Sequence, residues 1–136
     1  MLLRQRVILT LLREAGGKAS RLRLMKLAFL LAQESVLHGN QTYYRFVPYL
    51  YGPFSVALQQ ELSKLQQAHV IAGSPDNKSW LLQHFPENDC CLPAAIEKDI
   101  ARIVAKYRTF SSQQLLENVY QKYPWFTLNS KDKKTT

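Results

Sequence analysis

The sequence lacks any long hydrophobic run and contains little cysteine. Among its 136 residues the longest fully apolar stretch is Leu27–Ala32, whereas a transmembrane helix needs about 20 apolar residues. The opening stretch Met1–Arg6 is not followed by a small-residue cleavage site, and charge returns at Arg13, so it does not fit a signal peptide. Cys90 and Cys91 are adjacent, a spacing at which a disulfide would distort the backbone. We therefore expect a cytoplasmic protein without a membrane segment.

Residue patterns typical of catalysis are also scarce. The three histidines, at positions 38, 69 and 84, are scattered and form no metal-ligand spacing. The five glycines form no phosphate-binding loop. The acids Glu87 and Asp89 lie beside the two cysteines, where they would make a thiol less reactive. We therefore expect no enzyme, no metal and no cofactor.

Acidic residues are few relative to basic ones, and their shortage is uneven along the chain. Ten Asp and Glu face eighteen Lys and Arg, for a net charge of +8. The excess is +5 in residues 1–34 and +4 in residues 93–136, whereas residues 35–92 carry −1. A basic chain of this kind favours nucleic acid or an acidic partner, although many basic proteins bind neither.

Apolar spacing predicts five helices and three strands. Helical periodicity covers 3–14, 21–37 and 56–68, and it returns from Pro93 to Tyr107 and from Ser111 or Ser112 until just before Pro124. The helix at 21–37 is apolar around almost its whole circumference, which is typical of a buried central helix. Strands are expected at 43–51, ended by Gly52-Pro53, and at 70–72 and 78–85.

This order is typical of a winged-helix protein, because a helix at 56–68 leads directly into a two-stranded hairpin. The expected fold is mainly α (α+β), winged-helix-like, with a small antiparallel sheet and C-terminal helices. One domain would span residues 1–128, and the polar, lysine-rich residues 129–136 would form a disordered tail.

The helix at 56–68 is the first candidate for nucleic-acid contact. Its outward side chains are glutamines, a serine and a lysine, and Gln can pair with adenine while Lys serves guanine or phosphate. A solvated helix face explains the same residues, because Gln is a good helix former. The predicted contacts on this helix are Gln59, Gln60, Ser63 and Lys64.

Further phosphate contacts are predicted from the basic residues of the N-terminal region and of the hairpin. Each such contact would steepen the salt dependence of binding; an ordinary basic surface is the alternative. These residues are Arg4, Arg6, Arg21, Arg23 and Lys26, together with Lys78 in the hairpin. The ligand would be DNA or RNA, with DNA favoured.

An aromatic cluster offers a second interpretation, a protein-interaction module that docks a partner effector. Six of the fifteen aromatic residues fall within residues 43–54, and exposed tyrosines beside an edge strand are typical of an interface. The predicted contacts are Tyr43, Tyr49, Tyr51 and Phe54. A homodimer is also possible, because DNA-reading helices usually work in pairs and the last helix offers Leu115, Leu116 and Tyr120. Packing onto the domain's own core explains these three residues equally well.

Several of these segments together resemble a family. The stretch Leu24–Leu31, the run Tyr51-Gly52-Pro53-Phe54-Ser55, the leucines at 58, 62 and 65 and the pair Val70-Ile71 follow one pattern across residues 21–71. The pattern resembles the prokaryotic superfamily of winged-helix-like domains that includes the YwgA-like proteins, the SocA (Panacea) antitoxin domain and the C-terminal domain of the DarG antitoxin.

The resemblance implies a prokaryotic protein of a toxin–antitoxin or phage-defence system that acts by binding and not by catalysis. Some members of the superfamily neutralise a partner protein, in one case by mimicking DNA. A net charge of +8 does not suit a DNA mimic. We therefore expect nucleic-acid binding first and effector binding second.

Overall fold

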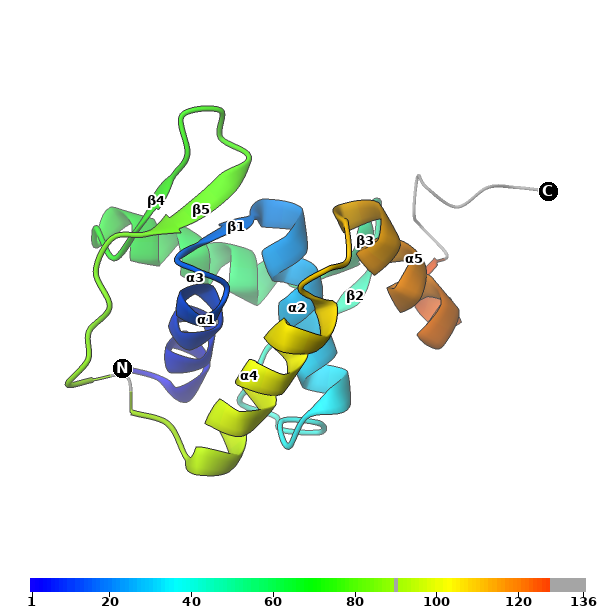
Figure 1. Ribbon diagram of the computed structural model, residues 1–136, viewed down its shortest axis with the longest axis horizontal. Coiled ribbons are helices and arrows are strands. Elements are labelled where there is room, and N and C mark those ends of the chain that lie inside the picture. The colour runs from blue at the N-terminus through cyan, green and yellow to red at the C-terminus, as the bar shows by residue number, and fades with distance from the viewer. Residues whose placement is uncertain (90, 128–136) are drawn as a thin grey trace.

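The computed structural model describes residues 1–89 and 91–127, and within them the fold is α+β, as expected (Figure 1). The expected tail at 129–136 lies outside the described residues. The five α-helices are α1 (Leu3–Glu14), α2 (Arg21–Glu34), α3 (Val56–Gln67), α4 (Ala94–Tyr107) and α5 (Ser112–Lys122), followed by the 3-10 turn η1 (Pro124–Thr127). The short strands are β1 (Lys18–Ser20), β2 (Val47–Tyr49), β3 (Gly52–Phe54), β4 (Ile71–Gly73) and β5 (Ser79–Leu82).

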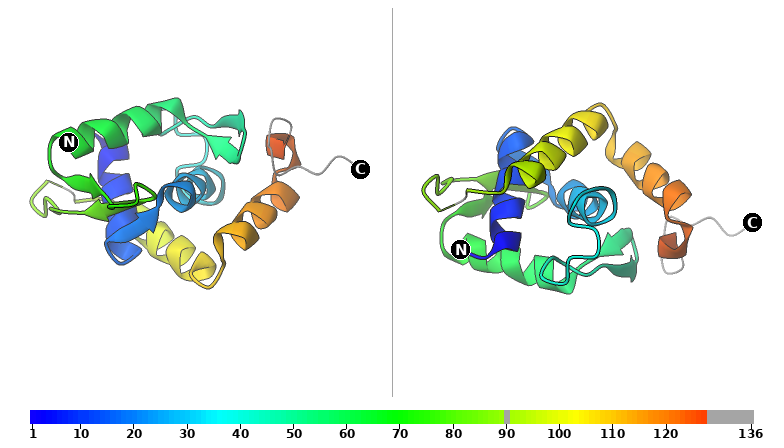
Figure 2. Two further views of the ribbon diagram at one scale, coloured as in Figure 1. Left: turned by 90° about the horizontal axis from the view of Figure 1, so that it is seen from above. Right: turned by 90° about the horizontal axis from the view of Figure 1, so that it is seen from below.

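Helix α2 is the centre of the molecule. Residues 24–31 are all buried, and α2 contacts α1, α4, α5, β1 and β3. Helices α3 and α4 lie on opposite sides of the molecule with α1 and α2 between them (Figure 2). Every helix contributes side chains to one apolar core, so the buried central helix predicted from the sequence is confirmed.

Local hydrogen bonds fix both ends of α2. The Ser20 hydroxyl accepts a bond from the Arg23 backbone N–H at 3.0 Å, which caps the first turn. The helix ends at Glu34 and not at residue 37, because the Ser35 hydroxyl donates back to the Leu31 carbonyl and accepts from the Leu37 N–H. The chain then turns through residues 36–39.

The larger sheet contains a strand that the sequence did not reveal. Its order is β1–β5–β4, antiparallel throughout, with Ala19 and Gly73 on either side of Trp80 in the register. Trp80, in the central strand β5, is buried. The pairing of β1 with β5 joins residues some sixty positions apart, and local pattern does not encode such a pairing.

The strand expected at 43–51 is confirmed only over its second half, as β2. Tyr43 and Tyr44 are buried in non-regular chain, and the strand begins only at Val47. Gly52-Pro53 does not end a strand but begins β3, which pairs with β2 in a separate two-stranded sheet beside α2 and α5. Gly52 directly follows the turn at residues 50–51 and has φ +104°, a conformation that only glycine adopts without strain.

The C-terminal helices pack onto the same core. Leu115 and Leu116 are buried and Tyr120 is half-buried, so packing within the domain accounts for the apolar face that also suggested a dimer. The Glu34 carboxylate accepts hydrogen bonds from the Tyr107 and Tyr123 hydroxyls at 3.0 and 2.9 Å. It also lies 3.4 Å from the ammonium groups of Lys106 and Lys122. This carboxylate therefore joins α2 to α4, α5 and the segment that follows.

Within residues 1–89 and 91–127, no helix has the length and apolar character needed to cross a bilayer.

Replacing Gly52 with alanine should destabilise the fold by roughly 2–4 kcal/mol. The new Cβ would lie 2.9 Å from Leu116 Cδ1, and the residue would also be strained at its positive φ. Gly16→Ala is the matched control, because Gly16 has φ +93° with no atom within 4 Å of the added Cβ. Urea unfolding should show a clearly smaller loss for Gly16→Ala; equal losses would contradict the close packing of β3 on α5.

Glu34→Gln should weaken the dependence of the free energy of unfolding on pH in the acid range. Burial opposes ionisation of Glu34, but the Tyr123 and Tyr107 hydrogen bonds and the charges of Lys122 and Lys106 outweigh it and hold its pKa below the ordinary 4.5. A carboxyl group with a depressed pKa stabilises the fold above its unfolded pKa, and this stabilisation is lost as the pH falls through the folded pKa.

Wild-type unfolding free energy should therefore fall as the pH drops below about 4.5, and the Glu34→Gln variant should lose less over that range. Glu117→Gln removes an exposed carboxylate from α5 and is the control. Identical pH profiles for wild type and Glu34→Gln would contradict the assignment.

Candidate nucleic-acid interface

Helix α3 presents a polar stripe on the outside of the molecule. The helix begins because the buried Ser55 hydroxyl accepts from the Leu58 backbone N–H at 3.2 Å. Leucines at 58, 62 and 65 point into the core. The α3 stripe consists of the exposed side chains Gln60, Ser63, Lys64 and Gln67. Gln59, also a predicted contact, is half-buried and turns toward α2 and the β2–β3 hairpin.

The single acid of α3 does not lie on the stripe. Glu61 is buried and accepts hydrogen bonds from Arg4 Nε at 3.2 Å and Gln5 Nε2 at 2.6 Å. The Arg4 guanidinium also lies 5.5 Å from the centre of the Tyr44 ring. Burial raises the pKa of Tyr44, the charge of Glu61 adds to the shift, and Arg4 opposes it. Arg4 therefore neutralises a buried carboxylate, and Lys64 sets the charge of the stripe.

The loop between β4 and β5, residues 74–78, is the second exposed element. Lys78 and Asp76 are both exposed. The Ser74 hydroxyl and the Lys78 backbone N–H donate to the Asp76 carboxylate and lower its pKa, while Lys78 and Lys18 add smaller electrostatic contributions. Formally, the loop carries one positive and one negative charge.

Arg21 fixes the position of this loop. Its Nε donates to the Asn77 carbonyl at 2.9 Å and its Nη2 to Asn77 Oδ1 at 2.6 Å. The guanidinium is stacked 3.8 Å above the centre of the Trp80 ring. A Cβ added at Gly73 would lie 3.1 Å from Arg21 Nη2 and 3.7 Å from Gln66 Nε2. The start of α2, the hairpin and the last turns of α3 therefore meet around one guanidinium.

Two other arginines that were predicted to contact phosphate donate hydrogen bonds to backbone carbonyls. Arg23 donates to the carbonyls of Tyr107 and Phe110, the second at 2.7 Å, and burial lowers its pKa. Arg6 donates to the carbonyls of Met1 and Cys91 at 3.0 and 3.3 Å. Both side chains therefore connect segments of the fold.

The position of Lys26 contradicts its prediction as a phosphate contact. Its exposed fraction is 2%, and Nζ lies 3.4 Å from the Leu22 carbonyl oxygen. The aliphatic part of the side chain packs under Gly52, whose added Cβ would meet Lys26 Cε at 3.8 Å. A phosphate cannot reach an ammonium in this position, so Lys26 is not a backbone contact for nucleic acid.

The aromatic residues predicted to bind a partner divide into two groups. Tyr43 is buried and its hydroxyl donates to the Ala28 carbonyl at 2.9 Å, so its expected exposure is wrong. Tyr49 and Tyr51 are 48% and 46% exposed. Phe54 is half-buried, and the centre of its ring lies 5.0 Å from that of Tyr49.

These tyrosines border a depression of about 150 Å³, which we call the tyrosine groove. It lies where the first turns of α2, the β2–β3 hairpin and Gln59 of α3 come together. Its lining includes Arg21, Leu22, Met25, Lys26, Tyr49, Tyr51, Phe54 and Gln59.

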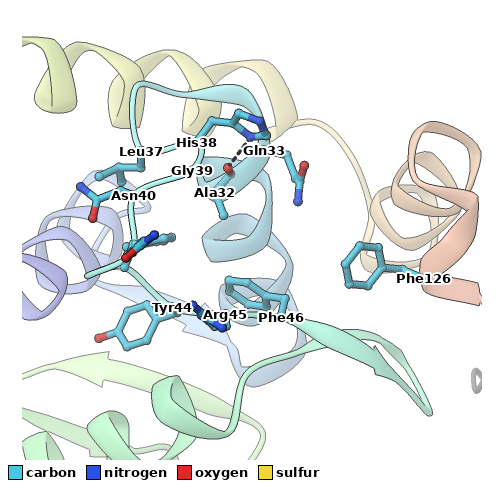
Figure 3. Close-up of a pocket in the computed structure, with 12 residues that line it drawn as sticks. Ala32, Gln33, Leu37, His38, Gly39, Asn40, Tyr44, Arg45, Phe46 and Phe126 are labelled. Carbon is cyan, nitrogen blue, oxygen red and sulfur yellow. Dashed lines mark hydrogen bonds between the residues drawn. The ribbon is translucent and has the colours of Figure 1, made fainter.

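A larger and more open pocket, of about 370 Å³, lies at the other end of α2 (Figure 3). His38 Nδ1 is 3.2 Å from the Ala32 carbonyl oxygen, and Phe126 approaches from η1 across the opening. The residues that line it include no carboxylate and no cysteine. Nor does the described part of the chain bring together three or more His, Cys, Asp or Glu side chains that could hold a metal ion.

Comparison of the chain with protein-family models, with curated proteins and with solved structures finds no match.

Arg23→Gln should lower the free energy of unfolding by about 1–3 kcal/mol, because the carbonyls of Tyr107 and Phe110 would lose a charged donor. Arg45→Gln is the control: Arg45 is exposed, and a surface change of this kind stays within about 0.5 kcal/mol. Urea unfolding followed by circular dichroism measures both. A stability loss no larger for Arg23→Gln than for Arg45→Gln would leave Arg23 without a structural role.

Proposed function

We propose that this chain is a non-catalytic nucleic-acid-binding protein of winged-helix type, with duplex DNA as its ligand. The observation that carries the proposal is the order α1–β1–α2–α3–β4–β5 combined with the sheet order β1–β5–β4. In this arrangement α3 is the helix that enters the major groove, and the β4–β5 loop contacts the adjacent backbone. The β2–β3 hairpin is an insertion between α2 and α3.

The chemistry of the α3 stripe supports base contact. Gln60 and Gln67 carry amides that can pair with the edge of adenine, and Lys64 can serve guanine or a phosphate. Ser63 donates its hydroxyl to the Gln59 carbonyl at 3.2 Å and keeps its lone pairs available. Because Glu61 is turned inward and paired with Arg4, no carboxylate of α3 opposes an approaching phosphate.

The loop supports a smaller contribution from phosphate contacts. Lys78 and the nearby Lys18 are exposed, while Asp76 opposes them. Arg21 acts in this proposal as a positioning residue, because it holds the loop to the start of α2 by two hydrogen bonds. The proposed contacts are therefore Gln60, Ser63, Lys64, Gln67 and Lys78, with Arg4, Arg6 and Arg23 as supports of the fold.

The setting we propose is a prokaryotic toxin–antitoxin or phage-defence system. This setting is supported by the resemblance of residues 21–71 to the antitoxin superfamily. The residues that carry the resemblance pack in the core or fix local structure. Leu27, Phe29 and Leu58 are buried, Ser55 caps α3, and Gly52 makes the close approach to Leu116. Such residues define a fold more than an activity.

The double variant Lys64→Glu/Lys78→Glu should abolish binding of a labelled DNA duplex in fluorescence anisotropy. The matched control is Lys98→Glu/Arg108→Glu, which changes the net charge equally but alters α4 and its end on the opposite side of the molecule (Figure 2). The wild type should lose affinity with salt at a slope near −0.9 per phosphate contact. Asp76→Asn should strengthen binding, because it removes the acid of the loop.

Equal loss in the two double variants would show attraction by net charge alone and would contradict a site on α3. Absence of binding by the wild type at low salt would overturn the proposed function altogether, since electrostatic attraction is strongest there.

A further inference from the structure

The tyrosine groove is an exposed apolar site that the proposed DNA contacts do not use. Leu22, Tyr49 and Tyr51 border it and are 49%, 48% and 46% exposed. Met25 and Phe54 contribute further apolar lining. Three large, half-exposed apolar side chains around one depression are more typical of an interaction site than of solvated surface.

The elements that line the groove are packed against the rest of the fold. The β2–β3 hairpin contacts α2, α5 and η1, and a Cβ added at Gly52 would lie 2.9 Å from Leu116 Cδ1. Arg21 is fixed on Trp80 and Asn77. A site built by three elements that are packed in this way is preorganised, which lowers the entropic cost of binding.

Both charged residues in the lining are basic. Arg21 lies at one side, Lys26 is buried within the lining, and no acid is among the lining residues. The only other long polar side chain there is Gln59, from α3. A ligand that suits this lining is apolar where it enters the groove and negatively charged beside it.

The volume restricts the kind of ligand. Sites for complete small molecules usually measure about 300–1,000 Å³, whereas this groove measures about 150 Å³. That space suits a single aromatic or branched aliphatic side chain. The backbone on which such a side chain is carried would then lie across the exposed tyrosines.

We propose that the tyrosine groove binds a short acidic segment of a partner protein by taking up one apolar side chain that is flanked by carboxylates. Leu22, Tyr49, Tyr51 and Phe54 contact the apolar side chain. The guanidinium of Arg21 attracts the carboxylates, and the net charge of +8 favours a negatively charged partner at long range.

Two other occupants fit less well. A second copy that presented the same groove across a two-fold axis would bring the cations of both copies together. A nucleobase needs several hydrogen bonds at its edge, and Gln59 is the only amide side chain in the lining.

The test is a titration of the ¹⁵N-labelled full chain, followed by two-dimensional NMR, with the capped peptide Glu-Asp-Phe-Asp-Glu. Amide shifts should concentrate at Leu22, Tyr49, Tyr51 and Gln59. Replacing the phenylalanine of the peptide with serine should weaken binding at least tenfold, in line with the burial of one apolar side chain. The charge-reversed peptide Lys-Lys-Phe-Lys-Lys should not bind.

Leu22→Ser should reduce the affinity for the acidic peptide about tenfold. Leu2→Ser, at a residue of the same type with 56% exposure at the start of α1, should leave it unchanged. Wild-type-like spectra of each free variant establish that it is folded.

Absence of shifts at millimolar peptide, or shifts centred away from the groove, would overturn the proposal. So would tighter binding of a hexathymidylate probe to the same residues, or a dimer in sedimentation that Leu22→Ser dissociates. These outcomes are independent of duplex binding by Lys64 and Lys78, so either proposal can fail without the other.

Discussion

The structure depends on burying a helix that has no polar side. Eight consecutive residues of α2 are shielded from water, so other elements must cover it in every direction, and α1, α4, α5, β1 and β3 do so. This requirement explains why the C-terminal helices are part of the core and why Lys26 is buried, with its Cε close to Gly52 of β3. It also leaves α3 at the outside, where one leucine row packs inward and the opposite stripe stays in solvent.

Much of the helical framework could be predicted from the sequence, because apolar periodicity and capping serines act over a few residues. The start of α2 after Ser20 and of α3 after Ser55 are examples. Strand β1 was missed because three residues without strand character become a strand only by pairing with β5. The segment from Tyr43 was misread because aromatic and β-branched residues favour a strand, whereas Tyr43 and Tyr44 bury their rings in irregular chain.

The candidate site was predictable in part. The outward position of Gln60, Ser63 and Lys64 follows from the leucine spacing, and the structure confirms their exposure. The partners of the arginines could not be predicted, because Arg23 meets backbone carbonyls more than eighty residues away. A carbonyl acceptor has no signature in the sequence. Clustered positive charge therefore suggested a phosphate site where the fold uses guanidinium groups as internal donors.

Arg21 belongs to two places at once: it holds Asn77 in the β4–β5 loop and it lines the tyrosine groove. A ligand that moved Arg21 at one of these places would therefore also act on the other. Any ligand that displaces this guanidinium from one of them changes the free energy of the other, and linkage requires the effect to be reciprocal and equal in magnitude. This side chain, stacked on Trp80, is thus a direct physical connection between the β4–β5 loop and the tyrosine groove.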